Sequence, residues 1–118
     1  MIPQCKKNKN IYSTEEKVIG VWKNGKPIYR RITEGVLDGT YKENGYTFTW
    51  IDINRYAETQ IDVRFYIDIE NGRRLTEGSK FIDYLLSTVN TLQVGCDDTI
   101  VPANSSITII SEYTKNTD

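Results

Sequence analysis

Histidine is absent from this sequence, and several other residue types are scarce. The 118 residues contain no histidine, two cysteines, three prolines and one methionine. The absence of histidine excludes the commonest general base, the nucleophile pairs that depend on it and most transition-metal sites. The glycines also lack the spacing of a phosphate-binding loop. We therefore expect a protein that is not an enzyme, with no catalytic residues, no cofactor and no metal.

Excess charge and long apolar runs are missing as well. Lysine and arginine number 15 against 16 aspartates and glutamates, which gives a net charge of -1. Nucleic acids and anionic membranes attract an excess of cations, so we expect this protein to bind neither. The sequence has no run of about 18 apolar residues and no apolar signal peptide after Met1. These absences predict a soluble protein that is not exported by that route.

Residues that favour β-strands are abundant. The sequence contains 15 Ile, 7 Val, 13 Thr and 8 Tyr, but only 5 Leu and 2 Ala. Branching at Cβ suits a pleated, half-buried surface better than a helix. The length is that of one small domain. The sequence therefore predicts an all-β fold, a small antiparallel β-sandwich or barrel-like domain over residues 12–118.

A polar segment precedes the predicted domain. Lys6, Lys7 and Lys9 cannot join a core, so we expect residues 1–11 to form an extended arm that is ordered only where it docks on something. Cys5 lies in this arm, and Cys96 is the only other cysteine. Two isolated cysteines are compatible with one disulfide, but two reduced thiols are the favoured interpretation.

Three Asn-Gly pairs lie between strand-like runs, at positions 24–25, 44–45 and 71–72. Asn-Gly supplies the two residues with positive φ that a type I′ hairpin turn needs. We therefore expect three tight hairpins. In the first, a two-residue loop of Asn24 and Gly25 would place Trp22 opposite Pro27, where the proline ring can lie against the indole.

Two segments predict long strands. Residues 61–69 alternate strictly, with apolar side chains on one face and Asp62, Arg64, Tyr66 and Asp68 on the other. Residues 41–53, folded around the second Asn-Gly pair, predict a hairpin with Phe48 and Trp50 on one face. Residues 107–113 predict a final strand.

The segment from Ser79 to Leu92 is ambiguous. Its apolar residues recur at helical spacing, and Ser79 is a suitable helix cap. Two strands that flank a turn near residues 88–90 are the alternative. The β-rich composition of the chain favours the strands.

Aromatic side chains that are exposed on the surface are the feature of this sequence that indicates binding. Tyr46, Tyr66 and Trp50 are candidates for contact with a glycan or a protein partner, because sugar rings stack on exposed aromatic rings. The competing interpretation places large aromatic side chains in the core, and it is favoured for the tryptophans. The residues that it assigns to the core are Trp22, Phe48, Trp50 and Phe65. A free carbohydrate-binding module that uses the exposed tyrosines is therefore one hypothesis.

Both ends of the chain resemble a known family. Residues 12–31 read YSTEEKVIGVWKNGKPIYRR and include Trp22, Asn24, Gly25, Pro27 and Tyr29. This stretch resembles a recurrent segment of bacteriophage fibre and tail proteins, Tyr-Ser-Thr-(Asp/Glu)-Glu followed by Gly-x-Trp-x-(Asp/Asn)-Gly-Lys-Pro-(Ile/Leu)-Tyr. The ending EYTKNTD, residues 112–118, is similar to the Glu-Tyr-Thr-Lys-Thr-Thr-Asp ending of the same domains, with Asn116 in place of threonine.

The resemblance implies a virion structural protein of a bacteriophage, a fibre or decoration domain on the head or tail. Such domains are commonly homotrimeric and assemble in the host cytoplasm. The implied partners are further copies of the chain and other capsid or tail proteins, together with a host-surface glycan where the domain aids adhesion. The resemblance implies no catalytic residues. The carbohydrate-binding module is the alternative.

Overall fold

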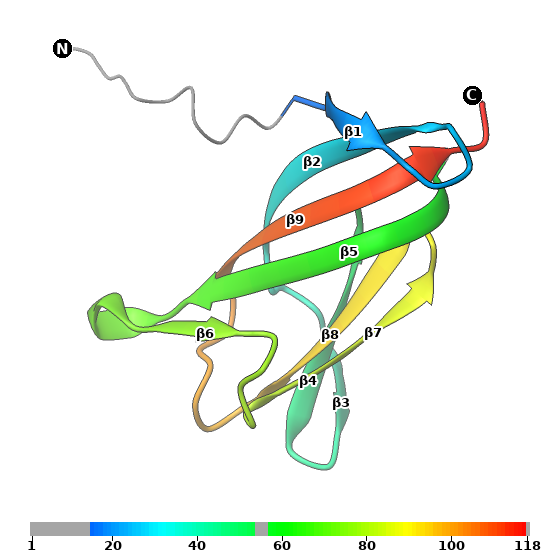
Figure 1. The fold of residues 1–118 in the computed structure, drawn as a ribbon. Helices are drawn as coiled ribbons and strands as arrows, with labels where there is room; N and C mark the ends of the chain where they lie inside the picture. The colour runs from blue at the N-terminus through cyan, green and yellow to red at the C-terminus, as the bar shows by residue number, and fades with distance from the viewer. Residues whose placement is uncertain (1–14, 54–56, 118) are drawn as a thin grey trace, which may run out of the picture.

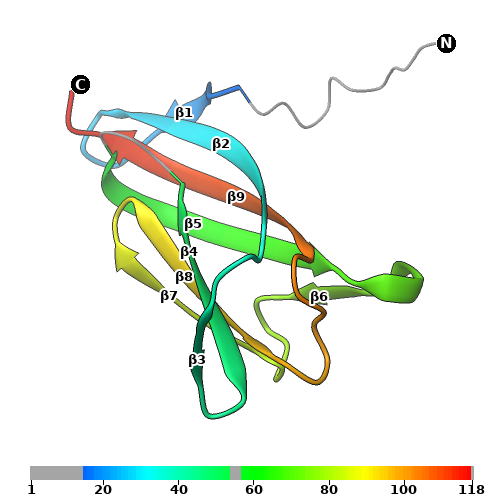
Figure 2. The same cartoon turned by 180° about the vertical axis from the view of Figure 1, so that it is seen from behind.

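The computed structural model describes residues 15–53 and 57–117, and their strands form two antiparallel sheets (Figures 1 and 2). The first sheet has the order β1-β2-β9-β5-β6, and the second has the order β3-β4-β8-β7. The bounds are β1 Lys17–Val21, β2 Pro27–Val36, β3 Tyr41–Glu43, β4 Tyr46–Asp52, β5 Ala57–Asp68, β6 Arg74–Thr76, β7 Ile82–Thr88, β8 Thr91–Asp97 and β9 Ser106–Lys115.

The prediction of an all-β fold is confirmed, since no α-helix occurs within the described residues. The ambiguous segment from Ser79 to Leu92 contains β7 and the start of β8, so the interpretation as two strands is correct. These strands pair through Leu86↔Leu92 and Thr88↔Thr91 on either side of a tight turn. The predicted arm, residues 1–11 with Lys6, Lys7, Lys9 and Cys5, lies outside the described residues.

The core lies between the two sheets. In β5 the predicted alternation is confirmed, because Phe65 and Ile67 are buried while Arg64 and Asp68 are exposed. The neighbouring strand β9 adds two fully buried isoleucines to the same layer, and β8 supplies the opposing layer. These side chains are Ile107 and Ile109 from β9, and Leu92, Val94 and Cys96 from β8. Alternating β-branched and apolar residues thus give each sheet one buried face.

Two of the three Asn-Gly pairs have the predicted positive φ at both residues. Asn44 and Gly45 have φ of 54° and 83°, and the strands on either side pair directly at Glu43↔Tyr46. Asn71 and Gly72 have φ of 66° and 72° in the short 3₁₀ turn Glu70–Gly72 between β5 and β6. There the Ile69 N–H donates to the Arg73 carbonyl oxygen at 2.9 Å, so the loop has three residues instead of the expected two. Positive φ at both central residues of a two-residue loop, as at Asn44 and Gly45, defines the type I′ turn, whose twist matches that of the flanking strands.

In the first hairpin the predicted turn is wrong. Gly25 has φ of 86°, but Asn24 is not among the residues with positive φ. The Trp22 N–H donates to the Lys26 carbonyl oxygen at 2.8 Å, so the loop has three residues and Val21, rather than Trp22, faces Pro27. The Asn24 side chain explains the difference, because its Oδ1 accepts the Lys26 N–H at 3.0 Å and only glycine has to take the left-handed conformation.

Candidate functional site

Described residues from the two parts of the chain that carry the family resemblance lie close together. Strand β9 ends beside the β1–β2 hairpin (Figures 1 and 2). There the Glu16 carboxylate accepts hydrogen bonds from the Tyr113 hydroxyl and the Lys115 ammonium. The Tyr29 and Tyr113 rings stack with centroids 6.0 Å apart, and the Lys115 Nζ lies 4.3 Å from the centroid of Tyr29. We call Glu16, Tyr29, Tyr113 and Lys115 the terminal cluster.

The electrostatics of the terminal cluster indicate a structural role. Partial burial acts to raise the pKa of Glu16, but the hydrogen bonds from Lys115 and Tyr113 outweigh it and hold this pKa below its usual value. Burial, together with the hydrogen bond to Glu16, raises the pKa of Tyr113. The buried hydroxyl therefore stays protonated and donates to the carboxylate. The groups bond to one another across almost the whole length of the chain, which joins β9 to the segment before β1.

A second group of aromatic residues lies on the outer face of the four-stranded sheet. The ring centroids of Tyr41, Phe48 and Trp50 are 5.9 to 6.3 Å apart, so the three rings form a mutually contacting triangle. Tyr41 is 53% exposed and Trp50 is 47% exposed. We call these three residues the aromatic face.

The aromatic face corrects the assignment of Trp50 and Phe48 to the core. The side chains of β4 that point inward include Thr49, which is buried, and Ile51, which packs against the core. Gly95 on β8 pairs with Phe48, and a Cβ at Gly95 would lie 2.5 Å from the Phe48 ring. The Phe48 ring therefore occupies the outer surface that a side chain at position 95 would fill. Of the other two predicted core aromatics, Phe65 is buried and Trp22 is half-buried in the first hairpin.

The structure brings together two of the three predicted contact residues. Tyr46 shares the outer face of β4 with Trp50, and its hydroxyl donates to the Lys80 carbonyl oxygen at 3.4 Å. Tyr66 lies on the outer face of the other sheet, with the Arg74 guanidinium 4.2 Å from its ring centroid. Tyr41 was missed by the sequence analysis. Counting back from the Asn44–Gly45 turn places it opposite Phe48, so the turn was a signal that could have found it.

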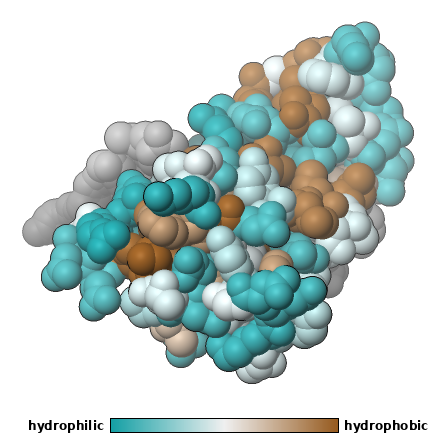
Figure 3. All heavy atoms as spheres, turned by 90° about the horizontal axis from the view of Figure 1, so that it is seen from below, coloured by the Kyte–Doolittle hydropathy of each residue, from teal (hydrophilic) through white to brown (hydrophobic). Residues whose placement is uncertain are grey.

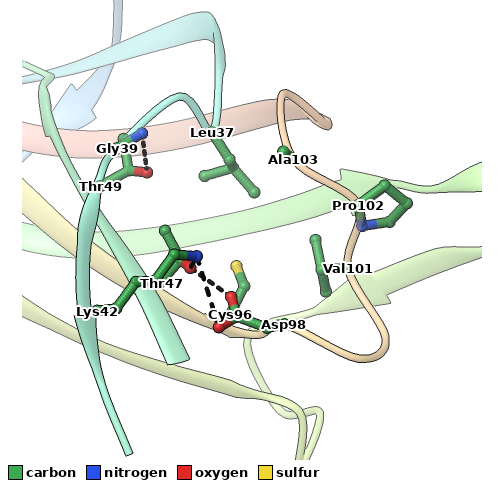
Figure 4. Close-up of a pocket in the computed structure, with 10 residues that line it drawn as sticks. All are labelled: Leu37, Gly39, Lys42, Thr47, Thr49, Cys96, Asp98, Val101, Pro102 and Ala103. Atoms are coloured by element: carbon green, nitrogen blue, oxygen red, sulfur yellow. Dashed lines mark hydrogen bonds and ion pairs between the residues drawn. The ribbon is translucent and has the colours of Figure 1, made fainter. Parts of the chain in front are cut away.

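A pocket of about 220 Å³ opens on the inner side of β3 and β4 (Figure 4). At its polar end the Lys42 Nζ donates to the Thr47 Oγ1 at 2.8 Å, and Thr47 donates to the Asp98 carboxylate. Cys96 lines the apolar part and has no disulfide partner among the described residues. Burial, and to a lesser extent Asp98, raises the pKa of this thiol to about 12. A thiol with such a pKa is a poor nucleophile at neutral pH, and the polar groups of the pocket bond to one another.

Within residues 15–53 and 57–117 the two sheets have four edge strands, which differ in length and chemistry. The edges formed by β3 and β6 are only three residues long and contain charged side chains. Strand β1 has five residues, with Val18 60% and Val21 70% exposed. Strand β7 has seven residues and exposes a tyrosine and two leucines, Tyr84, Leu85 and Leu86. Short and charged edges protect against pairing with another chain, whereas long apolar edges invite it.

A shallow groove of about 290 Å³ lies beside the β7 edge. Tyr84 and Leu86 line it from β7, and Ile61 and Val63 line it from β5. The apolar surface of the β7 edge therefore continues between the two sheets. On the face seen from below, apolar side chains lie in separate groups among polar ones (Figure 3).

Comparisons with protein-family models, curated proteins and solved structures find no match to this chain. Within the described ranges, no three histidine, cysteine, aspartate or glutamate side chains are grouped so that they could hold a metal ion. The same residues include no helix with the length and apolar character that a membrane span requires.

Proposed function

We propose that this protein is a virion structural domain of a bacteriophage, a fibre or decoration domain on the head or tail that assembles as a homotrimer. The observation that carries the proposal is that the edge strands β1 and β7 are longer and expose several apolar side chains, whereas the edge strands β3 and β6 have only three residues each. The resemblance at both chain ends supports the phage context.

The chemistry of the two open edges favours a cyclic assembly. In a ring of identical subunits, each contact joins one surface of a copy to a different surface of the next copy. The edges β1 and β7 have different sequences and belong to different sheets, so each copy offers two distinct surfaces. Within the described residues each of these two edge strands pairs with one other strand. Pairing β1 of one copy with β7 of the next would give each edge a second partner strand and bury their apolar side chains.

Light scattering on the purified full chain tests the assembly. We expect a mass three times that of the 13.6 kDa chain. The variants Val21→Lys and Leu86→Lys, which place a charge on one edge each, should shift the protein to monomers. Thr108→Lys is the matched control, because it adds the same charge to β9, a strand paired on both sides. A wild-type monomer at high concentration, or a trimer that tolerates both edge variants, would contradict the proposal.

The position on the particle needs a second experiment. A density map of the intact virion should show three copies of the domain on the head or tail, with the two edges at the subunit contacts. A map that accounts for every virion protein without this chain would contradict the phage assignment, whatever the mass in solution.

A further inference from the structure

We propose that the aromatic face binds a neutral saccharide chain, with Tyr41 and Trp50 stacked on the apolar side of a pyranose ring. This inference goes beyond the assembly described above and concerns a different surface. The aromatic face lies on the outside of β3 and β4, whereas the open edges are β1 and β7.

The arrangement of the rings selects a flat ligand. Each ring of the triangle contacts the other two, with interplanar angles of 36° to 59°. Phe48 is half-buried against Gly95, and the more exposed Tyr41 and Trp50 flank it. Rings that contact each other leave no space between them for a quaternary ammonium group, which is bound inside a cage of rings. They form instead an apolar platform of the kind on which the C–H groups of a sugar ring can stack.

The polar residues around the platform match the hydroxyl groups of a sugar. Gln93 pairs with Trp50 across β4 and β8, and its amide can donate and accept hydrogen bonds. The Glu43 carboxylate already accepts a hydrogen bond from the Tyr41 hydroxyl at 3.0 Å, which holds this ring in place and raises the pKa of Tyr41. Asp83 lies on the same outer face, opposite Gly95. Planar amides and carboxylates beside an aromatic platform can bind the equatorial hydroxyls of a stacked ring.

The charge of this face argues for a neutral ligand and against a second copy of the chain. The outward-facing strand residues of the four-stranded sheet contain no lysine or arginine, and they include four acidic residues, Glu43, Asp52, Asp83 and Asp97. Sialylated, sulfated or phosphate-rich glycans would be repelled by these carboxylates. Two copies that met through this face would bring eight carboxylates together, and like charges across an interface oppose association.

A binding assay with defined sugars tests the inference. Soluble neutral hexasaccharides of glucose, mannose, galactose and N-acetylglucosamine are titrated into the full chain, and tryptophan fluorescence and calorimetry report binding. We expect at least one of them to bind, and Trp50→Ala and Tyr41→Ala each to weaken binding by about tenfold or more, since stacking on one aromatic side chain is worth that much. Tyr66→Ala is the matched control, because it removes a tyrosine from the outer face of the other sheet. The Tyr66→Ala variant should bind the sugar with the affinity of the wild type.

Circular dichroism on each variant separates lost binding from lost folding. The inference is overturned if none of the four sugars binds at millimolar concentration, if a folded Trp50→Ala variant binds as well as Tyr66→Ala, or if sialylated chains or tetramethylammonium bind in preference. None of these results would bear on the assembly proposal, because light scattering reports on the edges and the sugar titration on the aromatic face.

Discussion

The terminal cluster and the aromatic face both consist of aromatic side chains with nearby carboxylates, yet they differ in what surrounds them. In the terminal cluster Tyr113 is fully buried, and its hydroxyl bonds to Glu16, 97 residues away in the sequence. In the aromatic face Trp50 is half-exposed, and its ring contacts Tyr41 and Phe48 on its own sheet. The comparison separates aromatic residues that hold the fold together from aromatic residues available for binding.

The same comparison gives a physical meaning to the family resemblance. Described residues from the two parts of the chain that carry this resemblance contact each other in and beside β2 and β9. Besides the terminal cluster, Arg30 pairs with Glu112 at 2.9 Å, and the two residues are opposite each other in the strand register. These contacts are structural, whereas the aromatic face belongs to the middle of the chain, outside the two parts that carry the resemblance.

Truncation of one aromatic residue in each region should have the largest effect. Tyr113→Ala removes a fully buried ring and leaves a cavity, so we expect it to lower the free energy of unfolding by about 3–5 kcal/mol. Trp50→Ala removes a half-exposed ring and should cost less than about 1 kcal/mol. Urea denaturation of both variants measures the difference. Equal costs would show that the aromatic face is as much a part of the folded core as the terminal cluster.

Glycine substitutions should sharpen the comparison on a smaller scale. At Gly95 a new Cβ would lie 2.5 Å from the Phe48 ring, so Gly95→Ala forces the ring to move and should destabilise the protein by about 1–3 kcal/mol. At Gly35, in β2, the nearest atom is the Ile107 Cγ2 at 3.9 Å, an ordinary contact. Gly35→Ala should therefore change the unfolding free energy by no more than about 0.5 kcal/mol.

The Gly95 variant also has a spectroscopic readout. Displacement of the Phe48 ring disturbs its contact with Trp50, so the emission of the folded protein should change in Gly95→Ala and remain as in the wild type in Gly35→Ala. An unchanged spectrum with unchanged stability would mean that the Phe48 ring does not rest on Gly95.

Glu16 in the terminal cluster should make the stability of the protein depend on pH, with a smaller effect than the substitutions above. The pKa of Glu16 is held below its usual value of 4.5 in the folded protein. A lowered pKa contributes stability that is fully present above about pH 4.5 and is lost as the pH falls through the folded-state value. Glu16→Gln should therefore cost about 1 kcal/mol at pH 7 and progressively less at acidic pH. Denaturation at pH 7, 4.5 and 3 measures this, and a cost that does not shrink on acidification would contradict the assignment.

The sequence predicts the strands better than it predicts which face of a strand is buried. Residues 61–69 place apolar residues on one side only, so their alternation identifies the core face. In β4, by contrast, both faces have residues that can be buried: Phe48 and Trp50 on one, Thr49 and Ile51 on the other. The large aromatic side chains led us to expect the face with Phe48 and Trp50 to be buried. In the structure the face with Thr49 and Ile51 is buried instead. The cause is the pairing with β8, where Gly95 leaves space for Phe48 on the outside, and no local pattern contains that information.

The turns show a similar limit. Asn-Gly predicts a tight reversal at all three positions, and each one occurs. The pair cannot distinguish a two-residue from a three-residue loop, because both need glycine in the left-handed conformation. The two three-residue loops differ in the asparagine, which has positive φ at position 71 but not at position 24. At Asn24 the side-chain hydrogen bond to the Lys26 N–H decides the outcome. The aromatic face depends on these registers, so Trp50 alone of its three residues could be named in advance as a contact residue.

The smallest effect is expected on the inner side of the four-stranded sheet, where the Cys96 thiol should react very slowly with an alkylating reagent. Cys96 lies behind the aromatic face, and burial raises the pKa of its thiol to about 12, so at pH 8 only about one thiol in 10,000 is ionised in the folded protein. In a Cys5→Ser background, Cys96 is the only thiol, and labelling with iodoacetamide should be negligible in buffer and rapid in denaturing urea. Rapid labelling in buffer, at a rate independent of urea, would mean that the pocket beside Cys96 opens readily, and that the aromatic face in front of it is not a rigid platform.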